Sequence, residues 1–269
     1  MRADVSVILP IIKLGEEEKN LFANAITGVS TQKVLPKKVI LVIPKNEEIK
    51  KELDSYDYPE NIKEDILIVE NENETDFCSQ VNLGVENVET EWLSILEIDD
   101  VYSNIWFDNF VKYSKAYDEV DTFLPIVLDV DVNNQFIHFT NEPVWARDFS
   151  EKLGFLDNDA LLNFPNFQLS GSIIKKESFV GVGKLKPSIK MFFNYEFLLR
   201  MTYYDKKIMT IPKIGYKKVN MREGSLFWGY KNNESDKIDI LEQKFWFNTS
   251  KKECYFKADR GIKYELESV

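Results

Sequence analysis

Cysteine and histidine are scarce in this chain of 269 residues, and their scarcity excludes several classes of site. Cys78 and Cys254 are too few and too far apart for a disulfide framework, which is typical of a reducing compartment, and they offer no zinc-binding spacing. A hydrolase with a Ser-His-Asp triad would depend on His138 alone. Because His138 lies in an alternating run, residues 135–139, we interpret it as an ordinary strand position.

Positive charge and long apolar runs are also scarce. The formal net charge is −11, and no cluster of lysine and arginine with interleaved aromatic residues stands out, so an extensive nucleic-acid-binding face is not predicted. No apolar stretch approaches the length of a membrane span. The run at residues 5–12 is too short for one and contains Pro10. We therefore expect a soluble protein of the cytoplasm.

The most informative stretch is residues 92–100, an apolar run that ends in Glu97, Asp99 and Asp100. Such a run predicts a buried strand, with its carboxylates at the strand end where open α/β sheets bind ligands. Carboxylates this close repel one another, and a divalent cation relieves the repulsion. Oxygen ligands suit Mg²⁺ or Mn²⁺, with phosphate oxygens completing the coordination. The alternative is an acidic turn that only ends the strand.

Short apolar segments alternate with helical patterns along the first half of the chain. Residues 5–10, 39–43 and 66–69 predict strands, and apolar residues at helical spacing predict helices at 16–29 and 76–88. This alternation predicts an α/β fold with a mostly parallel sheet flanked by helices. The second half predicts a helix at 103–117, a hairpin at 123–139, strands at 170–174 and 208–212, and helices at 194–204 and 236–247.

The order of these segments resembles the family 2 glycosyltransferases, the inverting enzymes with the GT-A fold. Residues 5–10, 25–42, 82–85, 92–100 and 171–183 are similar to the segments of that family in the same order. The resemblance implies a Rossmann-like sheet with a small hairpin. It also implies a nucleotide-sugar half at about residues 1–101 and an acceptor half at about 102–226. Residues 227–269 are then expected to form a helical, aromatic extension packed on this domain.

The resemblance further implies transfer of a sugar from a nucleotide-sugar donor, expected to be a UDP-sugar, to an acceptor hydroxyl with inversion. A metal, Mn²⁺ or Mg²⁺, held by Asp99 with Glu97 and Asp100 in support, would stabilise the departing diphosphate as a Lewis acid. The donor-binding positions that the resemblance implies are Pro10, Ile43, Asn82, Glu97 and Arg222.

Inverting transfer also needs a general base for the acceptor hydroxyl. In the family that base lies in an acidic pair at the start of a helix, and Asn194 stands at the corresponding place here. Glu196 is the nearest carboxylate, so we name both residues as catalytic candidates. The alternative for Glu196 is an ordinary helical ion pair, because it lies in a first turn and four residues before Arg200.

Several positions depart from the family pattern. Residues 43–46 stand where the family has aspartates that contact the uracil or ribose, and Asn220 stands where it often has a histidine. Arg222 can bind phosphate oxygens in a forked geometry, or it is a solvated loop arginine. These departures leave open a second hypothesis, a catalytically inactive GT-A-like binding or structural module. A sugar nucleotidyltransferase would need a glycine-rich phosphate loop, which residues 10–15 do not supply.

A second Asp-x-Asp pattern, Asp129-Val130-Asp131, leads into the Asn133-Asn134 pair, so we interpret it as turn chemistry with metal binding as the alternative. The acceptor is not specified by the sequence: saccharides, lipids and proteins are candidates. The C-terminal half faintly resembles glycosyltransferase-like proteins of large tailed phages, which adds modified DNA bases as acceptors and the host cytoplasm as location. Nothing in the pattern specifies an oligomeric state.

Overall fold

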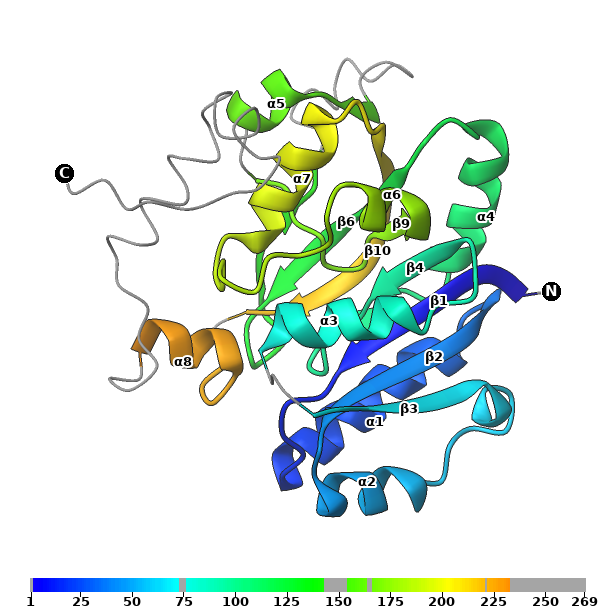
Figure 1. Ribbon diagram of the computed structural model, residues 1–269, viewed down its shortest axis with the longest axis vertical. Helices are drawn as coiled ribbons and strands as arrows, with labels where there is room; N and C mark the ends of the chain where they lie inside the picture. Colours follow the sequence, from blue (N-terminus) through cyan, green and yellow to red (C-terminus); the bar gives the residue numbers. More distant parts are fainter. Residues whose placement is uncertain (1, 73–75, 143–153, 164–165, 221, 233–269) are drawn as a thin grey trace.

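A ten-stranded sheet forms the centre of the molecule in the computed structural model (Figure 1). The structure describes residues 2–72, 76–142, 154–163, 166–220 and 222–232. The main path of the sheet runs in the order β3-β2-β1-β4-β9-β6-β10-β5, with β7 paired to β6 and β8 paired to β10. None of the described helices is long and apolar enough to cross a membrane. The predicted helix at 236–247 lies outside the described residues.

The first half of the chain supplies four parallel strands. Residues Val39 to Val42 pair with β1 on one side and β3 on the other, and β1 pairs with β4 through Val5 to Ile8. Parallel strands covered on both faces are expected to be nearly continuous apolar runs, as these are. The strands are β1 (Arg2–Pro10), β2 (Leu35–Pro44), β3 (Ile66–Asn71) and β4 (Trp92–Ile95).

The second half extends this sheet with mixed pairing. β9 lies antiparallel to both β4 and β6, whereas β6 and β10 are parallel, and β6 and β7 form the predicted antiparallel hairpin. The mostly parallel α/β sheet predicted from the sequence is therefore confirmed. The strands are β5 (Val101–Tyr102), β6 (Thr122–Val130), β7 (Phe136–Thr140), β8 (Phe155–Leu156), β9 (Ile173–Lys175) and β10 (Ile208–Val219).

Helices cover both faces of the sheet because successive strand residues point to opposite faces. On β1, Ile8 packs with the helices of one face, and Val7 and Leu9 pack with those of the other. The first face carries α3 (Phe77–Glu86), α5 (Asn158–Asn163), α6 (Lys176–Gly181) and α7 (Phe193–Tyr203), and the second α1 (Glu16–Ser30), α2 (Glu47–Asp54) and α4 (Trp106–Ala116). A short 3-10 turn (Lys63–Asp65) precedes β3, and α8 (Leu226–Asn232) follows β10.

Two predicted strand lengths are wrong. β4 ends at Ile95, and the chain then turns so that Asp100 N donates to Glu97 O at 3.1 Å, which places the carboxylates in a turn rather than in the strand. The last strand is longer than predicted because β10 continues past Pro212 to Val219. Its register against β6 shifts between Ile211 and Ile214, which lets the ladder bypass the proline, a residue without an N–H.

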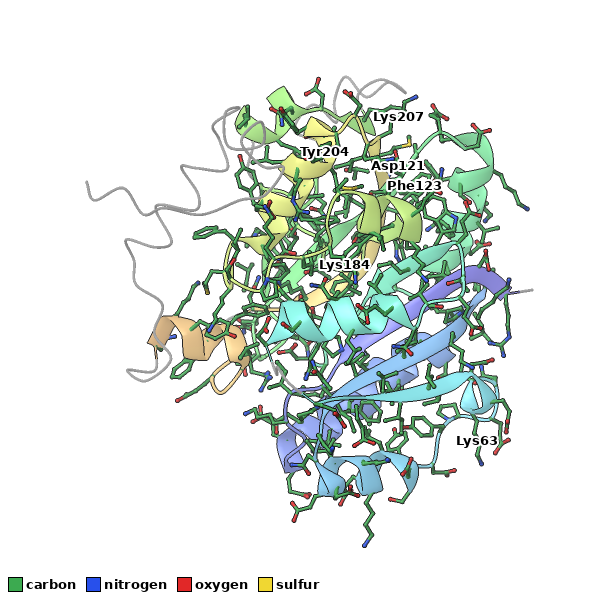
Figure 2. The ribbon with its side chains drawn as sticks, in the orientation of Figure 1. Lys63, Asp121, Phe123, Lys184, Tyr204 and Lys207 are labelled. Atoms are coloured by element: carbon green, nitrogen blue, oxygen red, sulfur yellow. The ribbon has the colours of Figure 1, made fainter. Side chains whose placement is uncertain are left out.

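Asp121 connects three strands where β6 and β10 begin and β9 ends. Its carboxylate accepts a hydrogen bond from Lys207 N at 2.9 Å and another from Ser178 Oγ, and its carbonyl accepts from Lys175 N at 2.9 Å. Figure 2 shows Asp121 and Lys207 close together, near Phe123. The side chain and backbone carbonyl of Asp121 together thus hold the starts of β6 and β10 near the end of β9.

Gly171 lies in a left-handed backbone conformation close to Tyr216. Its φ is +71°, and a Cβ at this position would overlap the ring of Tyr216. Replacing Gly171 by alanine is expected to lower the free energy of unfolding by about 2–4 kcal/mol, because left-handed backbone strain and overpacking add. Urea unfolding measures this change.

Gly181 is the matched control for this substitution. It lies in α6, and a Cβ there would have no neighbour within 4 Å. Gly181→Ala is expected to change stability by less than about 1 kcal/mol, in the stabilising direction. Equal effects of the two substitutions would contradict the assigned cause.

Candidate active site

A cleft of about 820 Å³ opens at the carboxyl ends of the parallel strands. Pro10 at the end of β1, the turn after β4 and the last residues of β10 form its floor, and the start of α7 and helix α8 form its walls. A crevice beyond the strand ends is where open α/β sheets bind ligands, and the volume suits a molecule the size of a nucleotide sugar.

Glu97, Asp99 and Asp100, which we call the acidic cluster, lie together after β4; Glu97 and Asp99 line the cleft, and Asp100 is buried beside them. One carboxylate oxygen from each lies within 4.8 Å of the other two. The turn after β4 brings them together, and Tyr216 fixes it because its hydroxyl accepts a hydrogen bond from Glu97 N at 3.1 Å. The predicted grouping of the three carboxylates is therefore present in the fold.

Asp100 is the most buried member of the acidic cluster. Its side chain is 1% exposed, and Oδ1 accepts a hydrogen bond from Val219 N at 2.9 Å. Oδ2 is buried and accepts no hydrogen bond from the described residues. Burial raises the pKa of Asp100 well above its usual value, and Glu97 and Asp99 raise it further. An unbonded buried carboxylate oxygen beside two other carboxylates fits a hard divalent cation.

Lys218 contacts the acidic cluster from the end of β10. Its Nζ donates to Gln168 Oε1 at 2.9 Å and to Ser170 Oγ at 3.3 Å, and lies 3.6 Å from Glu97 Oε1. Burial lowers the pKa of Lys218, but the attraction of Glu97 and Asp100 outweighs it, so that the pKa is raised. The ammonium group is therefore charged. Lys218 was not predicted from the sequence, because nothing in the Lys217-Lys218 pair distinguishes the residue that faces inward.

Arg222 is not a solvated loop residue, so that alternative is wrong. It is 7% exposed, and its Nε donates to Asp99 Oδ2 at 2.8 Å. Its Nη1 lies 3.5 Å from Glu17 Oε1 and 3.9 Å from Glu18 Oε1. The guanidinium group lines the cleft, as binding of phosphate would require, but it is paired with a carboxylate of the acidic cluster.

The two catalytic candidates lie in different environments. Asn194 lines the cleft at the start of α7. Glu196 is 0% exposed and does not line it. Arg200 binds both carboxylate oxygens of Glu196, at 2.8 and 2.9 Å, and Lys186 Nζ lies 3.4 Å away. The geometry therefore favours the ion-pair interpretation of Glu196, because a base must reach the acceptor hydroxyl.

Of the remaining donor-binding candidates, the structure brings Pro10 to the cleft but not Ile43 or Asn82. Ile43 is fully buried in the core on one face of the sheet. Asn82 exchanges two hydrogen bonds with the backbone of Leu185, at 2.8 and 3.0 Å. It therefore holds α3 against the loop before α7 rather than facing the cleft.

The second Asp-x-Asp pattern ends β6 and leads into a turn at Asp131, as predicted. Asp131 Oδ1 accepts hydrogen bonds from the backbone N–H groups of Asn133 and Gln135, both at 2.8 Å. Asp129 is 1% exposed and accepts from Thr140 Oγ1 at 3.1 Å and from Asn220 Nδ2. Asp129 thus holds Asn220, which lines the cleft, from behind.

Aromatic side chains line the end of the cleft near α8. The centroid of the Phe77 ring lies 5.3 Å from the ring centroid of Phe193 and 5.6 Å from that of Phe227. Trp228 and Tyr230 also line this end. This grouping was not predicted from the sequence, since α3, α7 and α8 meet only in the fold.

The search of solved structures found TarS of S. aureus. TarS 1-349 in complex with UDP-GlcNAc matches with a TM-score of 0.60 and 14% identity, over 84% of this chain and 60% of that chain. The complex of TarS 1-349 with UDP matches with a TM-score of 0.58 and 12% identity, over 100% and 94% of the two chains. TarS itself matches with a TM-score of 0.59 and 12% identity, over 95% of this chain and 50% of that chain.

These matches show that the chain has a GT-A-like fold. The fold predicted from the resemblance is therefore confirmed. The chain spans 60% of the first of these TarS chains and half of the last. No protein-family model matches the sequence, and the search of curated proteins found no match.

Proposed function

We propose that this protein is a glycosyltransferase that moves a sugar from a nucleotide-sugar donor, expected to be a UDP-sugar, to an acceptor hydroxyl with inversion. The observation that supports it best is the acidic cluster, of which Glu97 and Asp99 line a nucleotide-sized cleft in a GT-A-like fold. Structures with that fold include complexes with UDP and UDP-GlcNAc.

The residues of the cleft have distinct tasks in this proposal. Asp99 and Asp100, supported by Glu97, would hold Mn²⁺ or Mg²⁺, which supplies Lewis-acid stabilisation of the departing diphosphate. Arg222 offers its guanidinium group to phosphate oxygens once it leaves Asp99. Lys13 and Lys190 also line the cleft and add positive charge to it. The aromatic end of the cleft provides apolar faces for a sugar or an acceptor.

A second candidate is a donor-binding module without transfer, as the sequence left open. It is favoured by Asn194, because an amide in the cleft wall cannot accept a proton as a carboxylate does. Both candidates require nucleotide binding, and only the first requires release of the nucleotide from the donor.

A thermal-shift panel of nucleoside diphosphates and nucleotide sugars, with and without Mn²⁺, tests donor binding. A ligand present at about 100 times its dissociation constant is expected to add about 2.7 kcal/mol to stability, which raises the melting temperature. We expect this shift for UDP with Mn²⁺, and its loss in Asp99→Asn. The absence of a shift with any nucleotide would contradict the proposal.

Asp108→Asn is the matched control. Asp108 lies in α4, pairs with Lys112 at 2.6 Å and does not line the cleft. The same loss of one negative charge there is expected to leave the nucleotide-dependent shift unchanged.

A further inference from the structure

Two side-chain cations already contact the acidic cluster. Lys218 Nζ lies 3.6 Å from Glu97 Oε1, and Arg222 Nε donates to Asp99 Oδ2 at 2.8 Å. Asp99 and Lys218 are 12% and 17% exposed, so solvent screens these contacts only in part. The chain itself therefore places two positive charges against the three carboxylates of the acidic cluster.

Neither cation is free to move away without cost. Lys218 is held by Gln168 and Ser170, and Ser170 Oγ also donates to Glu97 Oε1 at 3.1 Å. Arg222 lies between Asp99 and the start of α1, where Lys13 Nζ pairs with Glu18 Oε1 at 2.9 Å. The ammonium of Lys218 also interacts with Asp100 and Asp129. Lys218 and Arg222 therefore belong to a network of hydrogen bonds and ion pairs that holds both side chains in place.

We propose that Lys218 and Arg222 keep divalent cations from binding tightly to the free protein, so that metal binds well only together with the donor diphosphate. This inference rests on the proposed function for the identity of the ligand. A divalent cation alone must enter against the positive charges of Lys218 and Arg222 and must take an oxygen of Asp99 from Arg222. A diphosphate removes both obstacles, because it brings negative charge and accepts the hydrogen bonds that Arg222 gives to Asp99.

Metal and diphosphate therefore bind with positive coupling, and the coupling is reciprocal. Because the positive charge of Lys218 opposes the metal in the free protein, its removal strengthens metal binding before any nucleotide is added. Lys218 acts in this inference as a positioning and charge-balancing residue and not as a catalytic residue.

The test is a titration of wild type and Lys218→Met with Mn²⁺ alone, followed by the electron paramagnetic resonance signal of unbound Mn²⁺. The expected result is a dissociation constant at least about tenfold lower in Lys218→Met, since one unit charge within a few ångströms has been removed. With UDP present, wild type is expected to gain at least about tenfold in Mn²⁺ affinity, and Lys218→Met less.

Lys217→Met is the matched control. Lys217 precedes Lys218 in β10, but its Nζ donates to the exposed Asn134 Oδ1 at 3.0 Å and does not line the cleft. Its Mn²⁺ affinity is expected to equal that of wild type. Arg222→Met tests the same inference at Asp99 if Lys218→Met fails to fold, and it is also expected to bind free Mn²⁺ more tightly.

The outcomes separate this inference from the proposed function. Tighter binding of free Mn²⁺ by Lys218→Met supports the inference even if no nucleotide binds to any variant, in which case only the proposed function fails. Equal Mn²⁺ affinities of wild type, Lys218→Met and Lys217→Met would overturn it. Weaker binding by Lys218→Met would overturn it as well, because Lys218 would then support the metal site.

Discussion

Replacing Arg200 by methionine is expected to lower the free energy of unfolding by about 3–5 kcal/mol, because it leaves a buried carboxylate without its partner. Arg200 is 2% exposed, and its guanidinium binds both oxygens of Glu196. It also donates to the carbonyl oxygens of Val182 and Lys184, the latter at 2.8 Å. The substitution therefore removes the ion pair and two attachments of the loop before α7. Urea unfolding measures the loss.

Lys112→Met is the control for this prediction. Lys112 and Asp108 form the same i,i+4 pair on α4, but the lysine side chain is 66% exposed. Because exposed pairs contribute about 0.3–0.5 kcal/mol in helices, this substitution is expected to have little effect. A loss below about 1 kcal/mol in Arg200→Met would show that the Glu196 pair is not the buried, structural contact described above.

Replacing Asn194 by aspartate is expected to raise the rate of donor hydrolysis about a hundredfold, since a positioned general base contributes about 10²–10⁴-fold. Asn194 lines the cleft, whereas Glu196 in the same first turn of α7 is held by Arg200. With water as the acceptor, release of UDP from a UDP-sugar measures the rate without knowledge of the natural acceptor. The rate of the variant is also expected to increase with pH as the new carboxyl group ionises.

Asn133→Asp serves as the control, because Asn133 lies in the exposed hairpin turn and does not line the cleft. Its hydrolysis rate is expected to equal that of wild type. If Asn194→Asp hydrolyses donor no faster than wild type while binding UDP equally well, the base of this protein does not lie at the start of α7.

Local sequence patterns predicted most of the fold. The first three predicted strands were found as β1, β2 and β3, and the turn that begins at Asp131 formed where short polar residues follow an apolar run. Asp76 caps α3 by accepting from Ser79 N at 3.0 Å. These features depend on side-chain spacing and on contacts within a few residues, both of which are written in the sequence.

The grouping of Glu97, Asp99 and Asp100 was predictable for the same reason, since the three carboxylates are neighbours in the chain. The length of β10 could not be predicted from the sequence, because its continuation past Pro212 depends on pairing with β6, more than eighty residues earlier in the chain. Pairing across such a distance can compensate for a proline that local propensity treats as the end of a strand.

The tertiary structure alone decided what surrounds the acidic cluster. Arg222 and Asp99 are 123 residues apart, and Lys218 contacts Glu97 from β10. The sequence offered both a catalytic and an ion-pair interpretation of Glu196, and only its burial with Arg200 distinguishes them. The sequence by itself thus determined which charged groups the protein has and that three carboxylates follow β4 closely in the chain. Long-range packing decided which charged side chains form ion pairs and which face the cleft, because burial and neighbouring charges set the charge state of a group.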